Sequence, residues 1–272
     1  MANTGIIVVG DSHYAALRDA ALARGLSRRR FGKKCTLHIF DAWHHKLLYP
    51  FHVTKDDKWV LNPKMAACVT EIAQRHRHSV FVSMFAGSHN HALAQVRHQR
   101  PFDVSMSEID RGRVRPDAEL VSQNYMRSAL MAWLPGPFQS MALFAKQVPC
   151  EKFVHIDSPS FSGDDDWSMQ HLDQYFIDNW PYDWPMALTD RKTRLKVKLI
   201  QSQLFEEECE RLGYTFISAP RESLCDEGFL KPEYCGSDTT HANKAYGELV
   251  LQSLEAFCGR KITAVETFQC EA

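Results

Sequence analysis

The sequence predicts an α/β fold, a three-layer α/β/α sandwich in which a five-stranded parallel sheet lies between two layers of helices. Two observations lead to this fold class. Short apolar segments rich in β-branched residues alternate along the 272-residue chain with stretches that have helical periodicity. No two successive apolar segments are joined by a hairpin-length turn, so each connection has room for a crossover. Such βαβ units build a parallel sheet covered on both faces.

Five apolar segments are expected to form the strands of the sheet. Their number suits a flavodoxin-like arrangement with the strand order 2-1-3-4-5, in which the site lies beyond the carboxyl ends of the strands. In chain order the expected strands are 5–10 (GIIVVG), 35–40 (CTLHIF), 79–86 (SVFVSMFA), 152–157 (KFVHID) and 214–219 (YTFISA).

Helices are expected between these strands and after the last of them. The stretch 118–147 is broken by LPGP at 134–137, and Gly259 is a stop signal for the last helix. In the fourth stretch, Leu195, Leu199, Leu204 and Cys209 fall loosely on one side, which indicates an amphipathic helix. The expected helical stretches are 13–24, 64–76, 118–147, 189–212 and 241–258.

The length suits a single domain over residues 1–272. Two connections are long enough to be insertions or lid-like loops, at about 94–150 and about 158–188. The 32 basic and 33 acidic residues nearly cancel, which argues against nucleic acid or an anionic membrane as the main partner. No apolar stretch approaches the ~20 residues of a membrane span. The first residues lead directly into a strand, and the eight cysteines form no CxxC pair, so a cytoplasmic protein with reduced thiols is expected.

Three segments carry chemically useful side chains where a single pocket would form. Asp11, Ser12 and His13 follow the first expected strand, and Asn90 lies in FAGSHNHAL (85–93) after the third. Asp238 and His241 directly precede the last expected helix. Each segment also has a structural interpretation: Ser12 as a helix cap, Asn90 as a turn residue, and Asp238 as a charge favourable at a helix N-terminus. Because the carboxyl ends of parallel strands share one edge, the functional interpretation gains weight from all three together.

In the functional interpretation, Ser12 is a nucleophile at a helix start, where backbone N–H groups can support an oxyanion. His241 takes its proton, and Asp238 orients the imidazole and stabilises the charge that forms on it. The chain order Ser, Asp, His is no obstacle, because such triads are defined by geometry. Asn90 would donate a hydrogen bond to the developing oxyanion.

These motifs resemble the SGNH (GDSL-like) hydrolase superfamily. The resemblance rests on GDS after the first strand, a loop with Gly and Asn after the third, and a terminal DxxH. The segment from Leu195 to the last helix also resembles the carboxyl-terminal part of bacterial SGNH-like proteins of unassigned substrate. The resemblance implies Ser12 as nucleophile, Asp238 and His241 as its partners, and an oxyanion hole at Ser12, Gly87 and Asn90.

The chain departs from the family pattern at two places. The third block reads Gly87-Ser88-His89-Asn90, so the Asn stands one place late or His89 takes its position. No glycine occurs between Gly32 and Gly87, so the second-block glycine is missing. The oxyanion hole is then either incomplete or built with another backbone amide near 42–44. Asp11, His13 and His89 are further candidates for contact with substrate.

Two other interpretations remain open. Asp11-Ser12-His13 and GSHNH loosely resemble motifs of calcineurin-like metallophosphoesterases, with Asp11 and His13 as metal ligands. Against this, the Gly-Asp and Gly-His-x-His motifs of that family are absent. A non-catalytic SGNH-like binding module would explain the missing glycine, but leaves the retained Ser12, Asp238 and His241 without a purpose.

The sequence therefore predicts a serine hydrolase, an esterase that cleaves an ester-linked acyl group through an acyl-Ser12 intermediate, or transfers that group. The expected substrate is a small-molecule or carbohydrate ester, with no metal or organic cofactor, no nucleic acid and no membrane partner. Trp167, Trp180 and Trp184 either stack on a sugar or anchor a surface loop. The oligomeric state is left open.

Overall fold

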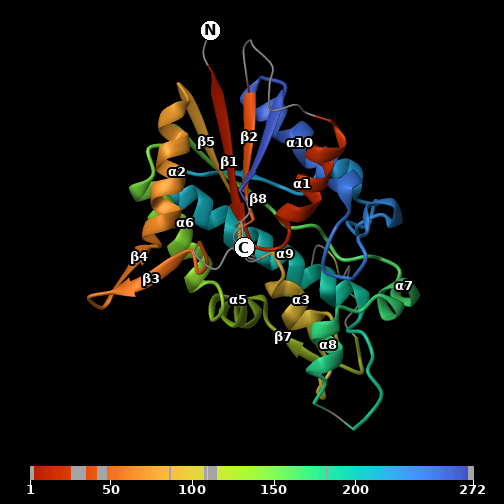
Figure 1. Ribbon diagram of the computed structural model, residues 1–272. Coiled ribbons are helices and arrows are strands. Elements are labelled where there is room, and N and C mark those ends of the chain that lie inside the picture. Colours follow the sequence, from red (N-terminus) through yellow and green to blue (C-terminus); the bar gives the residue numbers. More distant parts are fainter. Residues whose placement is uncertain are drawn as a thin grey trace.

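The central feature of the computed structural model is a parallel sheet of six strands in the order β10-β2-β1-β5-β8-β9 (Figure 1). The structure describes residues 3–25, 35–41, 48–85, 87–106, 109, 115–181 and 183–268. The strands of this sheet are β1 (Thr4–Gly10), β2 (Cys35–Phe40), β5 (His78–Met84), β8 (Lys152–Ile156), β9 (Thr215–Ile217) and β10 (Ala264–Phe268).

The order of the five expected strands, 2-1-3-4-5, is confirmed, because they correspond to β2, β1, β5, β8 and β9. The expected count of five is wrong. β10 pairs in parallel with β2 and adds a sixth strand at that edge. An edge strand has one neighbour, and only the first two residues of β10 are buried, so it lacks the continuous apolar run of the inner strands.

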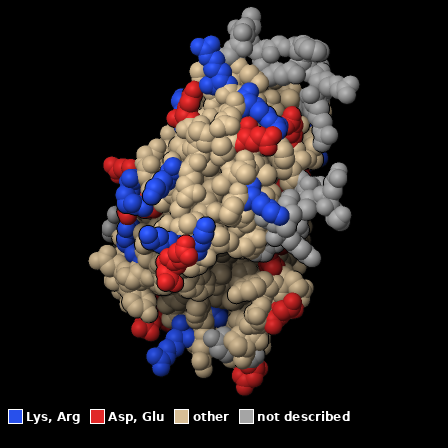
Figure 2. Space-filling view, turned by 60° about the vertical axis from the view of Figure 1, so that its left-hand side comes forward, with Lys and Arg blue, Asp and Glu red and all other residues tan. Residues whose placement is uncertain are grey.

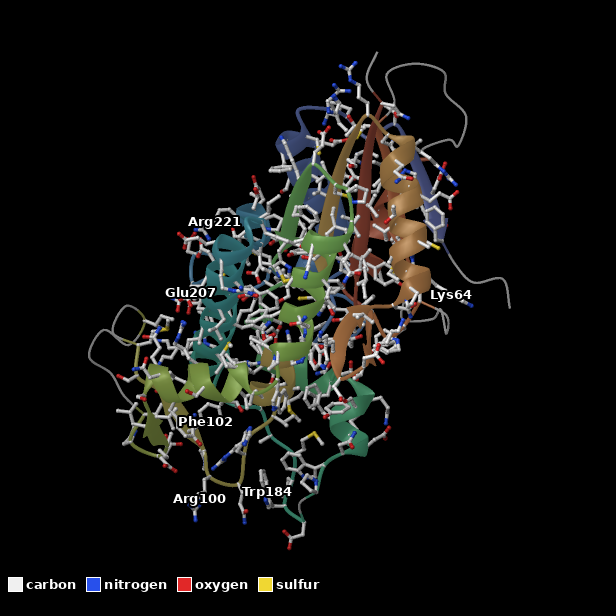
Figure 3. The ribbon with its side chains drawn as sticks, turned by 90° about the vertical axis from the view of Figure 1, so that its left-hand side faces the viewer. Lys64, Arg100, Phe102, Trp184, Glu207 and Arg221 are labelled. Carbon is white, nitrogen blue, oxygen red and sulfur yellow. The ribbon has the colours of Figure 1, made fainter. Side chains whose placement is uncertain are left out.

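Helices cover both faces of the sheet (Figures 1 and 3). Along β1, Ile6 and Val8 belong to one buried cluster, and Ile7 and Val9 belong to the other, as the alternation of side chains in a strand requires. The first cluster contains residues of α1 (Tyr14–Ala23) and α10 (Lys244–Cys258), and the second contains residues of α2 (Pro63–Arg75), α6 (Pro135–Gln147) and α9 (Arg191–Leu212).

The 22-residue helix α9 differs from the expected amphipathic pattern. Leu199 is 38 % exposed, whereas Lys196 and Lys198 are buried. Each lysine has a buried carboxylate partner: Lys196 Nζ lies 2.8 Å from Asp103 Oδ1, and Lys198 Nζ lies 2.7 Å from Asp157 Oδ1. The helix is therefore buried on several sides, and its charged residues meet partners that are distant in the sequence.

The two long insertions contain regular elements that lie beyond the carboxyl ends of the sheet strands (Figure 1). A hairpin that the sequence did not indicate, β3 (His52–Lys55) and β4 (Lys58–Leu61), lies at the same end. The remaining elements are α3 (His89–Ala94), β6 (Phe102–Val104), β7 (Glu119–Val121), α5 (Gln123–Met131), α7 (Asp165–Gln170), α8 (Gln174–Asp178), and two 3-10 turns, η1 (Arg221–Ser223) and η2 (Pro232–Tyr234).

The surface and the helices carry two general features. Acidic and basic side chains are interspersed over the face shown in Figure 2, as expected for a chain with a formal net charge of −1. In the described parts of the chain, no helix combines the length and the apolar character that crossing a bilayer requires.

The close approach of α1 and α10 holds the two ends of the site together. Gly247 of α10 faces α1, where a Cβ atom at position 247 would come within 2.0 Å of the Ala16 backbone oxygen. Only a glycine permits this separation without a shift of one helix. Ser12 directly precedes α1 and His241 precedes α10, so this contact also positions the two side chains relative to each other.

We expect Gly247→Ala to destabilise the protein. Overpacking of a buried contact costs about 1 to 3 kcal/mol, which exceeds the gain of up to about 1 kcal/mol from the better helix propensity of alanine. Urea unfolding followed by circular dichroism measures the change. Gln252→Ala, at an exposed position of the same helix, is the control and should change the free energy of unfolding by less than about 0.5 kcal/mol. A Gly247→Ala protein as stable as the wild type would contradict the close packing.

Candidate active site

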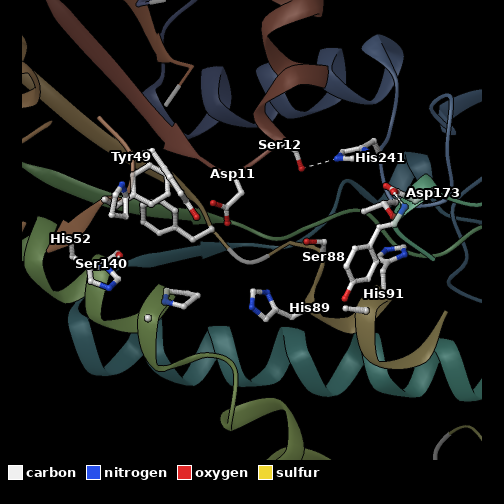
Figure 4. A pocket seen from close by; sticks show the side chains of 18 of the residues that line it. Asp11, Ser12, Tyr49, His52, Ser88, His89, His91, Ser140, Asp173 and His241 are labelled. Atoms are coloured by element: carbon white, nitrogen blue, oxygen red, sulfur yellow. Dashed lines mark hydrogen bonds between the residues drawn. The ribbon is translucent and has the colours of Figure 1, made fainter. Parts of the chain in front are cut away.

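Ser12 lies where β1 ends and α1 begins. The Asp11 N–H donates to the Met84 carbonyl at 3.1 Å, which ties the end of β1 to the end of β5. His13, not Ser12, is the N-cap of α1, and no side chain caps this helix. The Ser12 hydroxyl instead lies 2.6 Å from His241 Nε2 (Figure 4). Of the two interpretations of Ser12, the structure therefore excludes the helix cap.

His241 is held between Ser12 and Asp238. Its Nδ1 lies 2.9 Å from both carboxylate oxygens of Asp238. An ionised carboxylate only accepts, so Nδ1 carries a proton, and in the neutral imidazole the lone pair of Nε2 then faces the Ser12 hydroxyl. Asp238 Oδ1 also accepts the backbone N–H groups of Thr240 and His241, each at 2.8 Å. The same carboxylate thus fixes the loop and the orientation of the imidazole.

The surroundings of His241 favour its protonated form. Burial by itself would lower its pKa, but the hydrogen bond to Asp238 and the charge of Asp238 outweigh burial, and Asp173 adds to their effect, so the pKa is raised above 6.5. For Asp238, burial acts to raise the pKa, but the hydrogen bond to His241 and the backbone N–H donors hold it below 3.8. The pair is therefore polarised towards imidazolium and carboxylate.

Asp173 is a member of the site that sequence reasoning missed. It is the N-cap of α8, and its Oδ1 accepts the Tyr175 N–H at 2.9 Å. Ligand-type atoms of Asp173, Asp238 and His241 all lie within 4.8 Å of one another, which makes them the metal-capable group among the described residues. Asp11 and His13, the ligands that a metallophosphoesterase would use, are not part of that group. In the sequence, Asp173 shows only a helix-cap signal.

His13 lies behind the site and does not line the pocket. Its side chain is buried, and its ring centroid is 5.2 Å from that of His241. Burial, followed by the nearby His241, His91 and Lys198, lowers the pKa of His13 well below 6.5. A Cβ at Gly87 would come within 2.1 Å of the His13 ring, so the glycine is needed for this packing. His13 therefore supports the ring of His241 as a neutral side chain.

In the segment after β5, the two residues predicted for the oxyanion hole, Gly87 and Asn90, are not among those that line the pocket. Ser88 and His89 line the pocket, as does Asp11. Asn90 is fully buried, and its Oδ1 accepts from Gln201 Nε2 of α9 at 3.2 Å. Its Nδ2 has no hydrogen-bond partner among the described residues. The alternative donor near residues 42–44 lies outside the described residues.

A pocket of about 640 Å³ extends from Ser12 and His241 towards the β3–β4 hairpin (Figure 4). At the end away from His241, His52 Nδ1 and Ser140 Oγ are 2.8 Å apart. The other residues that line the pocket are Tyr49, Pro50, Phe51, Phe85, His91, Ala92, Gly136, Pro137, Asp173, Tyr175, Phe176 and Thr240.

The three tryptophans considered for sugar binding are not among the residues that line this pocket. Trp180 and Trp184 pack against each other with ring centroids 4.6 Å apart, and Trp180 Nε1 donates to the Trp184 carbonyl at 3.0 Å. Trp167 stacks on His171 at 4.6 Å. These contacts favour the interpretation of the tryptophans as anchors of the insertion.

No protein-family model and no curated protein sequence matches this chain. Among solved structures, it is similar to the periplasmic domain of a lipopolysaccharide acetyltransferase from Salmonella ser. Paratyphi A, with a TM-score of 0.43 and 11 % identity over 96 % of this chain and 85 % of that one. It is also similar to Est24, a carbohydrate acetylesterase from Sinorhizobium meliloti, with a TM-score of 0.40 and 9 % identity over 94 % and 99 % of the two chains. Similarities this distant carry no conclusion about activity.

Proposed function

We propose that this protein cleaves, or transfers, an ester-linked acyl group through a covalent acyl-Ser12 intermediate. The observation that carries the proposal is the hydrogen-bonded series from Asp238 through His241 to Ser12, with distances of 2.9 and 2.6 Å. A serine hydroxyl that faces the lone pair of an imidazole, itself oriented by a carboxylate, is the arrangement that activates a nucleophile.

The chemistry follows from the position of each proton. Ser12 Oγ attacks the carbonyl carbon of the ester while His241 Nε2 takes the hydroxyl proton. The tetrahedral intermediate collapses, the bond to the alcohol oxygen breaks, and the imidazolium returns the proton to that oxygen. Water then attacks the acyl-Ser12 carbonyl with His241 again as base, which releases the acid; a second alcohol in place of water gives a transferred ester.

The oxyanion that forms on the carbonyl oxygen of the ester needs hydrogen-bond donors within reach of that oxygen. The backbone N–H of Ser12 is a natural donor, because N–H groups at the start of a helix have no intrahelical partner. We assign the second donor to the segment Gly87–Asn90. The buried Nδ2 of Asn90, which lacks a partner among the described residues, supports its assignment within that segment.

A fluorophosphonate probe tests the proposal, because it labels serines only where a base activates them. The protein is treated with the probe with and without EDTA, and the labelled peptide is identified by mass spectrometry. An adduct on Ser12 that survives EDTA is the expected result. Absence of an adduct overturns the proposal. Phosphodiesterase activity abolished by EDTA would then favour the metal-dependent alternative, and no activity at all would favour a binding module.

The pH profile provides a prediction about Asp173. His241 acts as base only when neutral, so kcat/KM rises with pH as the imidazole loses its proton. Since the pKa of His241 is raised, the acidic limb of the wild type should lie above pH 6.5. Asp173→Asn removes one charge that raises this pKa, and we expect the limb to move to lower pH. Asn keeps the cap of α8. The pH dependence of kcat/KM on a soluble ester measures the shift.

Asp178→Asn is the matched control for this measurement. Asp178 is an exposed residue at the other end of the same short helix, and it is not among the groups that raise the pKa of His241. Its replacement should leave the acidic limb where it is. A limb that is unchanged in Asp173→Asn, or that moves equally in both variants, would show that Asp173 does not act on the base.

A further inference from the structure

We propose, building on the acyl-Ser12 chemistry, that the acid part of the substrate is an apolar acyl chain of medium length rather than acetyl. The chain would occupy the half of the pocket formed by Tyr49, Pro50, Phe51, Phe85, Gly136 and Pro137, which we call the acyl chamber. His52 and Ser140 lie at the end of the chamber away from His241 (Figure 4).

The position of His241 decides which part of the ester faces the chamber. The alcohol oxygen must receive its proton from His241 Nε2, so the alcohol part leaves on the His241 side of Ser12. The acyl part then extends to the opposite side. Figure 4 shows Ser12 between His241 and Asp173 on one side and Tyr49 and His52 on the other. The acyl part therefore faces the chamber, and the alcohol faces the side of the pocket that carries Asp173 and α8.

The walls of the acyl chamber are aromatic and preformed. Phe51 and Phe85 are buried, with ring centroids 4.8 Å apart, and the Tyr49 ring lies against Phe51 at 5.5 Å. Of the two carboxylates that line the pocket, Asp173 lies beside His241, and Asp11 lies between Ser12 and Tyr49, at the entrance of the chamber (Figure 4). The walls beyond Asp11 are mostly aromatic and suit hydrocarbon.

The end of the chamber away from His241 carries two polar side chains, His52 and Ser140. His52 Nδ1 and Ser140 Oγ are hydrogen-bonded at 2.8 Å, and the His52 ring stacks on Trp59 at 4.5 Å. Burial lowers the pKa of His52, which favours a neutral ring. Neither side chain then carries a charge, so this end offers no partner for an ionised group, and the end of the bound chain should be uncharged.

The size of the pocket also exceeds the needs of a small acyl group. Its volume of about 640 Å³ lies within the ~300 to 1,000 Å³ of pockets that enclose drug-sized ligands. An acetyl group would fill only a small part of this volume. Each methylene moved from water into the chamber should improve binding about fourfold.

The chain-length profile of p-nitrophenyl esters tests the inference. We expect kcat/KM to rise about three- to fourfold per methylene from acetate through butyrate and hexanoate to octanoate. Gly136→Leu should remove this rise by filling the chamber, because a Cβ at position 136 meets only His52, at 3.7 Å. The ratio of octanoate to acetate kcat/KM should then fall at least about tenfold. Ala132→Leu, which places the same side chain at an exposed position outside the pocket lining, is the matched control and should retain the rise.

The outcomes separate this inference from the proposed function. If fluorophosphonate labels Ser12 but kcat/KM does not rise with chain length, or is highest for acetate, the inference about the acyl chamber is wrong. The proposed serine hydrolase mechanism is then still supported. No labelling and no ester hydrolysis overturns both. If Gly136→Leu fails to fold, as judged by circular dichroism, the wild-type series alone decides between a rising and a flat profile.

Discussion

Ser12→Ala is expected to reduce ester hydrolysis by at least about 10⁴-fold and to abolish fluorophosphonate labelling. The variant loses the only atom that can form the acyl intermediate, while the His241–Asp238 pair stays in place. The fold should be preserved, because the Ser12 hydroxyl bonds to His241, a side chain that is itself partly exposed. Removal of such a bond changes the free energy of unfolding by about 1 kcal/mol or less. Single-turnover hydrolysis and urea unfolding measure the two effects.

Ser253→Ala is the matched control for this prediction. The Ser253 hydroxyl bonds to the Leu249 carbonyl within α10, away from the pocket lining. Labelling and hydrolysis should therefore survive its replacement. If Ser12→Ala hydrolysed esters at the wild-type rate, the nucleophile would be water or another side chain, and the proposed mechanism would be wrong.

The central sheet was largely predictable because its inner strands are buried on both faces. Such strands read as unbroken apolar runs, and CTLHIF was placed with its observed bounds, Cys35–Phe40. β10 and the β3–β4 hairpin were not predicted, because they lack such an apolar run. β10 is an edge strand with two buried residues, and the hairpin has a single buried residue, so neither gives a clear apolar signal in the sequence.

The helix α9 shows why charged residues mislead a periodicity argument. Arg194, Lys196 and Lys198 would ordinarily mark a solvent face, but all three are buried. Their partners come from the two insertions and from the end of β8: Asp165, Asp103 and Asp157. A buried charge is tolerable only when it is paired. Nothing in the local sequence of α9 indicates a partner some 30 to 90 residues away.

The candidate site was predictable where position in the fold constrains it. Ser12 follows the end of β1, and Asp238 and His241 are three residues apart before a helix. The parallel strands therefore bring all three to the carboxyl end of the sheet. Asp173 and the acyl chamber come from segments whose placement depends on tertiary packing, and their residue types carry no signal of their own. Asn90 stands one place later than the Asn of the family pattern, and in the structure its side chain bonds to Gln201 of α9.

Asp238→Asn should reduce kcat by about 10⁴-fold, nearly as much as loss of the nucleophile. The carboxylate accepts the proton on Nδ1 and stabilises the imidazolium that forms when Ser12 attacks. An amide has no charge to stabilise the imidazolium, and its N–H2 group can hold His241 in the opposite tautomer, with Nε2 protonated towards Ser12. The Asn oxygen can still accept the N–H groups of Thr240 and His241, so the loop should keep its shape.

The matched control, Asp173→Asn, makes the same chemical change to a carboxylate that lies near His241 but accepts its hydrogen bond from the Tyr175 N–H. It should keep most of its kcat and change chiefly the pH dependence. Asp238 would then act through the orientation of the imidazole, which requires the bond to Nδ1, whereas Asp173 would act through its charge alone. Equal losses of kcat in both variants would contradict this division, because charge near His241 would then account for the whole effect, and the 2.9 Å contact would have no separate role.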